Sequence, residues 1–244
     1  MRPYYEDESI TLYLGDGREA PEELPHIAAI ITDPPYGVTS LGWDSWPKQW
    51  PALLAPRSRQ LWCFGSMRMF LTHRDEFEGW TYAQEVIWEK HNGSSFHADR
   101  FRRVHELVTH WYQGAWDSLT VNPQTTNDAT ARTVRRKERP QHMGQIAGST
   151  YASQDGAPRL MRSVIYCRSE HGRALHPTQK PLGILEPLVA YSTNPGDVIL
   201  DLFAGSGSTL VAAKLAGRRA IGVEIDEAYC EIAAGRLAQG VLVA

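Results

Sequence analysis

The sequence predicts an α/β fold built on a doubly wound, mostly parallel sheet. Short aliphatic runs that end in a polar residue recur at 26–33, 60–66 and 198–201, and such runs are typical of strands buried on both faces. A glycine-rich turn follows the third run and leads through an apolar helix to another strand, as in the units that build parallel sheets. At 244 residues the chain fits one large domain, or one domain with an insert.

Charge and cysteine content narrow the class of protein. The formal net charge is −3. Nucleic-acid-binding proteins often carry a strong positive charge, so this value argues against that class of protein without excluding it. Cys63, Cys167 and Cys230 form no CxxC pattern, so we expect reduced thiols in a cytoplasmic protein. We find no apolar run of membrane-spanning length and no signal-peptide pattern. The nine histidines show no ligand spacing, so no metal is expected.

Alternating or wholly apolar stretches predict the strands of the first half of the chain. These strands are expected at 10–14, 26–32, 60–66, 85–88 and 104–112, with a short helix or loop at 17–25 and a short helix at 69–77. Between 41 and 50 the sequence is typical of a loop that contains Trp43, Trp46 and Trp50. We expect these indoles as packing anchors, one of which could cover a bound base.

The second half of the chain supplies the remaining regular elements. Strands are expected at 161–167, 198–201 and 220–224, and helices at 176–192, 210–216 and 227–238. Pro187 predicts a kink or a late start in the first of these helices, because proline lacks the N–H that a helix interior needs. Gly217 and Asp226 are placed to cap the other two.

The stretch from 122 to 159 differs from the rest of the chain in composition. Its large aliphatic residues are limited to Val134, Met143 and Ile146, which are too few to build a core. We therefore expect a long, basic loop that becomes ordered on a polyanion, rather than a plain solvated loop. The expected organisation is a single domain, 1–244, in which a poorly structured insert at 91–160 separates residues 1–90 from residues 161–244.

The turn Asp33-Pro34-Pro35-Tyr36-Gly37 follows a predicted strand directly. Two consecutive prolines fix the backbone and remove two N–H donors, so the turn presents a carboxylate, bare carbonyl oxygens and an aromatic ring. This set suits a planar group that bears an amine. A plain strand exit with a capping aspartate would have the same sequence, so these residues alone do not distinguish it from a ligand site.

A second candidate site begins at Asp201 and ends at Glu224. The glycines of the turn allow a ligand to approach the backbone, and an acid at the end of the next strand suits ribose hydroxyls. Leu210 stands where a dinucleotide site would need its third glycine, and no lysine precedes Ser208 as in a P-loop. A nucleoside cofactor without a pyrophosphate, such as S-adenosylmethionine (AdoMet), fits better.

Asp33, Asp201 and Glu224 each end a predicted parallel strand. The carboxyl ends of such strands line one crevice in a doubly wound sheet. The geometry therefore predicts an amine-accepting turn beside a cofactor site, and the chemistry it favours is methyl transfer to an exocyclic amine.

Three segments in this order resemble the DNA amino-methyltransferases of the permuted β-class. They are Asp33-Pro34-Pro35-Tyr36, His176-Pro177-Thr178-Gln179-Lys180-Pro181 and Asp201-Leu202-Phe203-Ala204-Gly205-Ser206-Gly207-Ser208-Thr209. Placing the acid-Pro-Pro-Tyr turn before the cofactor loop is what indicates the permuted class. The resemblance extends from Leu12 to about Leu237, and the basic middle region is its exception.

The resemblance implies a role for each matching residue. Asp33 and the Pro34 carbonyl would accept hydrogen bonds from the target amine, within a catalytic turn that includes Pro35, and Tyr36 would stack on a base turned out of the duplex. The cofactor site would comprise Asp16, His176, Thr178, Lys180, Asp201, Phe203, Ala204, Gly205, Ser206, Gly207, Thr209, Glu224 and Asp226.

The resemblance also implies double-stranded DNA as the partner, and it permits a homodimer. Basic residues that we expect to contact DNA are Arg100, Arg102, Arg103, Arg132, Arg135, Arg136, Lys137 and Arg139. Nothing in the sequence indicates a partner nuclease, and the target sequence stays open.

Aspartate at the first position of the turn is similar to the adenine-N6 enzymes, so we favour adenine. Methylation of cytosine N4 or of RNA, and an inactive DNA-binding relative, are the alternatives. A nucleotide-dependent dehydrogenase is disfavoured by Leu210 and by the Pro-Pro turn.

Overall fold

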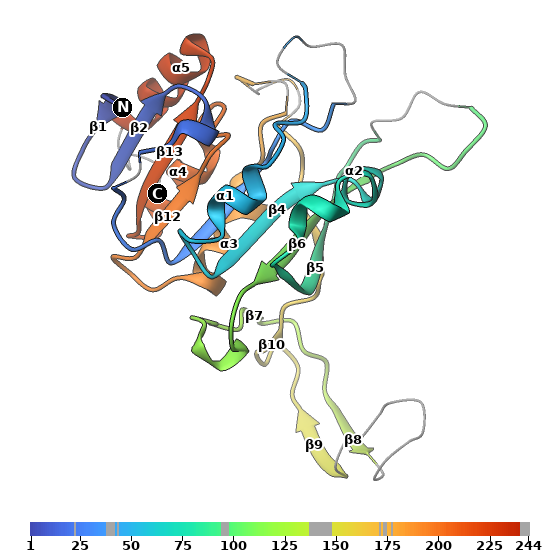
Figure 1. Cartoon of the computed structure of the whole chain (residues 1–244). Helices are drawn as coiled ribbons and strands as arrows, with labels where there is room; N and C mark the ends of the chain where they lie inside the picture. Colours follow the sequence, from blue (N-terminus) through green and yellow to red (C-terminus); the bar gives the residue numbers. More distant parts are fainter. Residues whose placement is uncertain are drawn as a thin grey trace. The chain divides into compact units, whose positions relative to one another are not determined.

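A computed structural model describes residues 1–21, 23–37, 42, 44–93, 98–136, 148–170, 172, 175–176 and 178–239. The chain divides into two compact units (Figure 1). One unit consists of Met1–Asn122 together with Ser163–Ala244, and the other is Pro123–Arg162.

Among the described residues of the larger unit, nine strands form one sheet. They are β1 (Pro3–Glu6), β2 (Ile10–Leu14), β3 (Ala29–Thr32), β4 (Gln60–Gly65), β5 (Thr81–Glu89), β6 (His105–Tyr112), β11 (Val164–Tyr166), β12 (Val198–Asp201) and β13 (Arg219–Glu224). Their order across the sheet is β1-β2-β13-β12-β3-β4-β6-β5-β11 (Figure 1). The predicted strands at 10–14, 60–66, 104–112 and 198–201 are confirmed with bounds that differ by a residue or less.

The strands at the centre of the sheet are parallel, whereas β1 and β6 run antiparallel to the strands beside them. β2, β13, β12, β3 and β4 run in one direction, while β6 runs antiparallel to both β4 and β5. Leu107, near the start of β6, pairs with Gly65 at the end of β4. The first residues of β6 therefore lie at the same edge of the sheet as the carboxyl ends of the parallel strands.

Helices cover both faces of this sheet, which confirms the doubly wound α/β prediction. They are α1 (Trp50–Leu54), α2 (Met67–Thr72), α3 (Leu182–Ser192), α4 (Ser208–Leu215) and α5 (Glu227–Ala238), with 3-10 turns η1 (Gly17–Glu19), η2 (Arg74–Phe77) and η3 (Trp116–Ser118). Side chains of α3, α4 and α5 pack with Ile31 on one face, whereas those of α1 and α2 pack with Ile30 on the other. Successive residues of β3 thus point to opposite cores, as the period of a strand requires.

The predicted start of the helix at 176–192 was wrong. α3 begins at Leu182 and contains Pro187 in its interior, without the late start expected near that proline. Proline removes one helical hydrogen bond, but α3 buries Ile184, Leu185 and Val189 in the core, and this burial offsets the loss.

The described residues of the smaller unit form four short strands in two antiparallel pairs. β7 (Thr125–Thr126) pairs with β10 (Arg159–Leu160), and β8 (Arg132–Arg136) pairs with β9 (Ser149–Ser153). Within its described residues, Ala129 is the one buried apolar side chain. Backbone hydrogen bonds hold these strand pairs together without an apolar core. Such strands leave no apolar pattern in the sequence, so the sequence did not predict them. The insert expected at 91–160 spans β6, which is part of the main sheet, and all but the last two residues of this unit.

Across the described residues, no helix has the length and apolar character needed to cross a membrane.

Candidate active site

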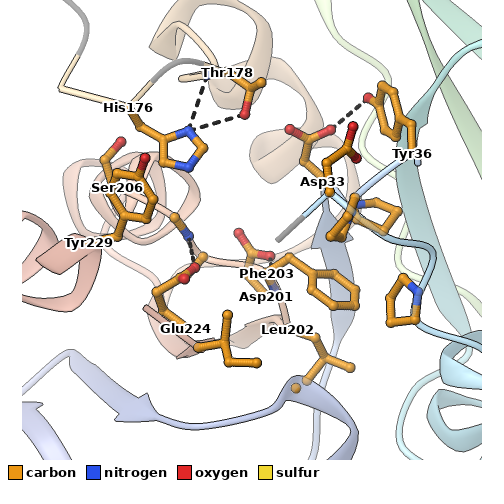
Figure 2. A pocket seen from close by; sticks show the side chains of 18 of the residues that line it. Asp33, Tyr36, His176, Thr178, Asp201, Leu202, Phe203, Ser206, Glu224 and Tyr229 are labelled. Atoms are coloured by element: carbon orange, nitrogen blue, oxygen red, sulfur yellow. Dashed lines mark hydrogen bonds between the residues drawn. The ribbon is translucent and has the colours of Figure 1, made fainter. Parts of the chain in front are cut away.

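The carboxyl ends of β3, β12 and β13 open into one pocket of about 390 Å³. Figure 2 shows Asp33, Asp201 and Glu224 around this space. The structure brings most of the predicted site residues to its wall. They are Asp16, Asp33, Pro34, Pro35, Tyr36, His176, Thr178, Lys180, Asp201, Phe203, Ala204, Gly205, Ser206, Thr209 and Glu224.

Two residues predicted for the cofactor site, Gly207 and Asp226, do not line the pocket. Gly207 precedes α4 with φ at 77°, and a Cβ there would lie 3.0 Å from the Cβ of Ala233. Asp226 caps α5 by accepting a 2.9 Å hydrogen bond from the N–H of Ala228. Both positions shape the backbone beside the pocket. The prediction placed them in the ligand site because helix caps and tight turns use the same residue types as ligand sites.

Both oxygens of the Asp33 carboxylate have a partner on the protein. Oδ1 accepts a 2.7 Å hydrogen bond from the hydroxyl of Tyr36, and Oδ2 accepts one from the Lys180 ammonium. Burial raises the pKa of Asp33, and the Lys180 charge opposes this rise. The Tyr36 ring is therefore held in place by the same carboxylate that the sequence predicts to receive an amine.

Glu106 lines the pocket, although the sequence reading did not select it. It is the second residue of β6, where the antiparallel direction of that strand brings it to the edge that carries Asp33. Oε1 accepts a 2.7 Å hydrogen bond from Lys90, and Oε2 lies 3.5 Å from the Lys180 nitrogen. Burial favours the protonated acid, but the charges of Lys180 and Lys90 outweigh it and lower the pKa of Glu106.

Asp201 is almost completely buried at the end of β12. Its Oδ1 accepts hydrogen bonds from the Thr32 hydroxyl at 2.7 Å and from the Phe203 N–H at 3.1 Å. Burial raises the pKa of Asp201 to about 6, although the hydrogen bonds from Thr32 and Thr209 lower it. The acid is thus ionised at pH 7 at a cost in stability, as is frequent for a group retained for binding.

Two backbone amides hold the Glu224 carboxylate at the end of β13. Gly205 N–H donates to Oε2 at 2.7 Å (Figure 2), and Asp226 N–H donates to Oε1 at 2.8 Å. Burial raises the pKa of Glu224, and these two bonds counteract the rise. Each oxygen keeps a lone pair for a hydroxyl group of a ligand.

His176 closes the pocket on the side of the cofactor loop. Its Nδ1 accepts a 3.1 Å hydrogen bond from Thr178 N–H, and its ring lies 4.1 Å from that of Tyr229 (Figure 2). Burial lowers the pKa of His176 to about 4, so the ring is neutral at pH 7. A Cβ on Gly205 would lie 3.6 Å from the His176 ring. Sequence reasoning missed Tyr229 because its position on α5 resembles any half-exposed helical site.

Asp16 and Trp46 also line the pocket. Arg18 donates through Nε to Asp16 at 3.0 Å, within η1. Trp46 donates to Glu76 at 2.8 Å and stacks on His73 at 4.1 Å. It therefore belongs to both the packing and the pocket wall, whereas Trp50 is fully buried and Trp43 lies outside the described residues.

The predicted DNA-contacting residues fall in two separate places. Arg100, Arg102 and Arg103 are exposed in the connection between β5 and β6, in the larger unit. Arg132 and Arg135 are exposed on β8 in the smaller unit. The side chain of Arg136, and the whole of Lys137 and Arg139, lie outside the described residues.

The charge of the pocket wall favours a positively charged ligand. Six acids among the described residues line it, namely Asp16, Asp33, Asp44, Glu106, Asp201 and Glu224. Arg18 and Lys180 line the same pocket and carry the opposite charge. A pocket with this excess of carboxylates stabilises a cation by its electrostatic potential.

Comparisons with known proteins find a matching family and relatives along most of the chain. A family model described as DNA methylase, of the N6 and N4 methyltransferases, matches residues 27–235. The chain is 26% identical to type II methyltransferase M.HinfI of Haemophilus influenzae, over 93% of the chain and 68% of that protein. It is 28% identical to type II methyltransferase M2.LlaDCHI of Lactococcus lactis subsp. cremoris, over 98% of the chain and 93% of that protein.

The fold is also similar to that of a solved structure, M1.HpyAVI in complex with S-adenosylmethionine. The crystal structure of the M1.HpyAVI-SAM complex has a TM-score of 0.63 to this chain and is 25% identical to it. The similarity covers 93% of this chain and 99% of that one.

Proposed function

We propose, since the chain belongs to the DNA methylase family of N6 and N4 methyltransferases, that it methylates the N6 amine of adenine in DNA. The family makes the chain a DNA methyltransferase with AdoMet as its cofactor. The choice of adenine is our proposal. The observation that carries it is aspartate at the first position of the turn, as in the adenine-N6 enzymes, since Asp33 shares one pocket with Asp201 and Glu224.

The pocket fits AdoMet in its charge and in its polar groups. AdoMet is a sulfonium cation with a ribose, and the wall combines an excess of carboxylates with Glu224, whose two oxygens are fixed by backbone amides. Ile225 lines the same pocket with 63% of its side chain exposed, which offers an apolar surface to a purine. Glu224, Ile225, Phe203 and the Gly205 backbone are the groups that we expect to hold the nucleoside, and Asp201 the methionine amine.

Bound AdoMet supplies an electrophilic methyl group, and the protein has to make a poor nucleophile react with it. The lone pair of an exocyclic base amine is delocalised into the ring. The Asp33 carboxylate and the Pro34 carbonyl accept the amine hydrogens, which favours the tetrahedral nitrogen and its developing positive charge. Because burial raises the pKa of Asp33, this carboxylate is also suited to receive the proton that the amine loses.

The Tyr36 ring supplies the stacking surface for the base. Its hydroxyl is anchored on Asp33 at 2.7 Å, so the ring and the acceptor keep a constant relation to each other. An amine inside a duplex cannot reach Asp33, and the target base therefore has to leave the stack.

Nucleoside analysis of methylated DNA tests the proposal. The purified chain is incubated with AdoMet and unmethylated DNA, the DNA is digested, and the nucleosides are separated by mass spectrometry. We expect N6-methyldeoxyadenosine. Detection of N4-methyldeoxycytidine would transfer the proposal to cytosine, the alternative that the family leaves open. Methyl groups on RNA alone would contradict DNA as the substrate.

We also propose that the smaller unit and the arginines at 100–103 bind the DNA. Arg132 and Arg135 are exposed cations on a unit with almost no buried apolar side chains among its described residues. Such a unit contributes surface rather than core. Sequencing that detects methylated positions in DNA from cells expressing the chain would identify the target sequence.

A further inference from the structure

Glu106 and Lys180 form a buried charge cluster with Asp33 that the mechanism above leaves unused. The Lys180 ammonium donates to Asp33 Oδ2 and, at 3.3 Å, to the Thr178 carbonyl. Glu106 Oε2 lies 3.5 Å from the same nitrogen, which is within ion-pair range but beyond a strong hydrogen bond. Within the described part of the chain this buried oxygen has no hydrogen-bond partner. The Lys180 ammonium therefore has a second carboxylate, that of Glu106, close enough to bond after a small movement.

The position of Lys180 determines how well Asp33 can serve an amine. A cation on Asp33 Oδ2 occupies the oxygen and opposes positive charge on the reacting nitrogen, since like charges repel strongly in a buried site. If the ammonium moves onto Glu106, Asp33 keeps its full negative charge for the amine. A lysine has a flexible stem and three donors, so a small shift is enough.

The surroundings of Glu106 keep its carboxylate ionised and fixed. Lys90 donates to Oε1 at 2.7 Å, and its nitrogen lies 4.4 Å from the centre of the Trp88 ring. The Arg103 charge acts in the same direction. Only 12% of the Glu106 side chain is exposed. Among the described residues, the charged groups that act on Glu106 are Lys90, Lys180, Arg103 and Asp33, and three of these four are cations.

We propose that Glu106 is a positioning residue that takes the Lys180 ammonium from Asp33 when the target amine enters the pocket. The inference rests on the proposed function, in that Asp33 has to accept an amine. It applies equally to adenine and cytosine, because the exocyclic amine is common to both.

The test compares Glu106→Gln with the parent enzyme in single-turnover methyl transfer at pH 6 to 9. Glutamine keeps the shape and an oxygen that accepts a hydrogen bond, but it lacks the negative charge that draws the ammonium from Asp33. We expect at least a tenfold lower rate, with the dissociation constants of AdoMet and DNA changed less than threefold. The acid limb of the rate profile should move to lower pH, because Lys180 then stays on Asp33 and lowers its pKa.

A second background separates positioning from a structural role. In Lys180→Met, the change Glu106→Gln should alter the rate less than twofold, since no ammonium is left to position. An equal loss in both backgrounds would overturn the proposal, and so would an unchanged rate in Glu106→Gln. If Glu106→Gln does not fold, Glu106→Asp provides the test, with a smaller loss that Lys180→Met again removes. A parent that methylates no amine would instead contradict the proposed function.

Phe101 supports a second inference from a different observation. It is 99% exposed and lies between Arg100 and Arg102 in the connection from β5 to β6. The strands that this connection joins end and begin beside the pocket, because Glu89 pairs with His105 and Leu107 with Gly65. Arg100 is aligned by two 2.8 Å bonds to Asp99. An aromatic ring held in water among cations matches the chemistry of a base stack between phosphates.

We infer that Phe101 enters the DNA base stack where the target base leaves it, which again rests on DNA being the substrate. With 2-aminopurine at the target position, Phe101→Ala should reduce the fluorescence increase on binding at least threefold, and Phe101→Trp should restore it. Tyr82, an exposed aromatic residue at the opposite edge of the sheet, is the control, and Tyr82→Ala should leave the signal unchanged. An undiminished signal in Phe101→Ala would overturn the inference.

Discussion

The Thr32 hydroxyl donates a 2.7 Å hydrogen bond to Asp201, a residue 169 positions later in the chain. Thr32 ends β3, which leads into the Asp33 turn, and Asp201 ends β12, which leads into the glycine-rich loop. The two strands are parallel neighbours. This bond therefore ties the turn proposed to receive the base to the loop proposed to hold the cofactor.

We predict that Thr32→Val weakens AdoMet binding in a pH-dependent way. The Thr32 bond lowers the pKa of Asp201, which is about 6, so its removal raises that pKa and protonates more of the acid near neutral pH. Calorimetry should show a loss of affinity of roughly tenfold at pH 6.5 that shrinks toward pH 8.5. Thr32→Ser keeps the hydroxyl and should bind as the parent does. An equal loss at every pH would indicate that packing, not ionisation, is responsible.

Asp201→Asn should stabilise the protein without cofactor while abolishing AdoMet binding. The pKa of Asp201 rises from 3.8 to about 6 on folding. A raised pKa means that stability is fully present below 3.8 and is lost as the pH passes through 6. Asparagine does not ionise and avoids this loss, so above pH 6 the free energy of unfolding of Asp201→Asn should exceed that of the parent by about 3 kcal/mol. Urea unfolding at pH 5 and pH 8 measures it, and equal stability of the two proteins at pH 8 would refute the ionisation account.

Asp33→Ala should lower the rate of methyl transfer about 100-fold or more, as expected for the loss of a group that stabilises developing charge. AdoMet affinity should stay within a few-fold of the parent, because the groups proposed to hold the nucleoside and the methionine amine lie on β12, β13 and the loops that follow them. Filter binding of AdoMet and a single-turnover assay measure the two quantities. A large loss of cofactor affinity would instead assign Asp33 to the cofactor pocket.

Sequence patterns located the acids at the strand ends because each signal is local. Asp33, Asp201 and Glu224 follow directly on the apolar runs that predict their strands, and the rules of a parallel sheet then bring these ends together. The ion pair between Asp33 and Lys180 joins residues 147 positions apart, and no local pattern encodes it. Glu106 was missed for the same reason, since its place at the pocket depends on β6 running antiparallel to β4.

Local signals also misled where two roles share one residue type. Gly207 and Asp226 match a ligand loop, but one provides a positive φ before α4 and the other caps α5. The smaller unit shows the converse. Its strands pair through backbone groups, and the alternation of apolar side chains that identifies a strand in a core is absent from Thr125–Thr126 and Ser149–Ser153.

His110 should make the protein sensitive to acid. The residue is fully buried, and its ring stacks on Trp62 at 4.2 Å. Burial lowers the pKa of His110 from 6.5 to about 4. Its contribution to stability is therefore present above pH 6.5 and is lost as the pH falls toward 4, by up to about 3 kcal/mol. His110→Phe keeps a stacked ring and should flatten the fall in unfolding free energy between pH 6.5 and 4.5. The exposed His26, replaced in the same way, should leave the fall unchanged.

The arginines of β8 should contribute separately to DNA binding. Arg132 and Arg135 are three positions apart on one strand, and side chains alternate across a strand, so the two point to opposite faces. A duplex that lies on one face meets only one of them. We therefore expect one of Arg132→Ala and Arg135→Ala to weaken DNA binding and to reduce the slope of log affinity against log salt by about 0.9. The other change should leave both quantities near those of the parent. Fluorescence anisotropy between 50 and 200 mM salt measures the slope, and two unchanged slopes would remove β8 from the proposed DNA contacts.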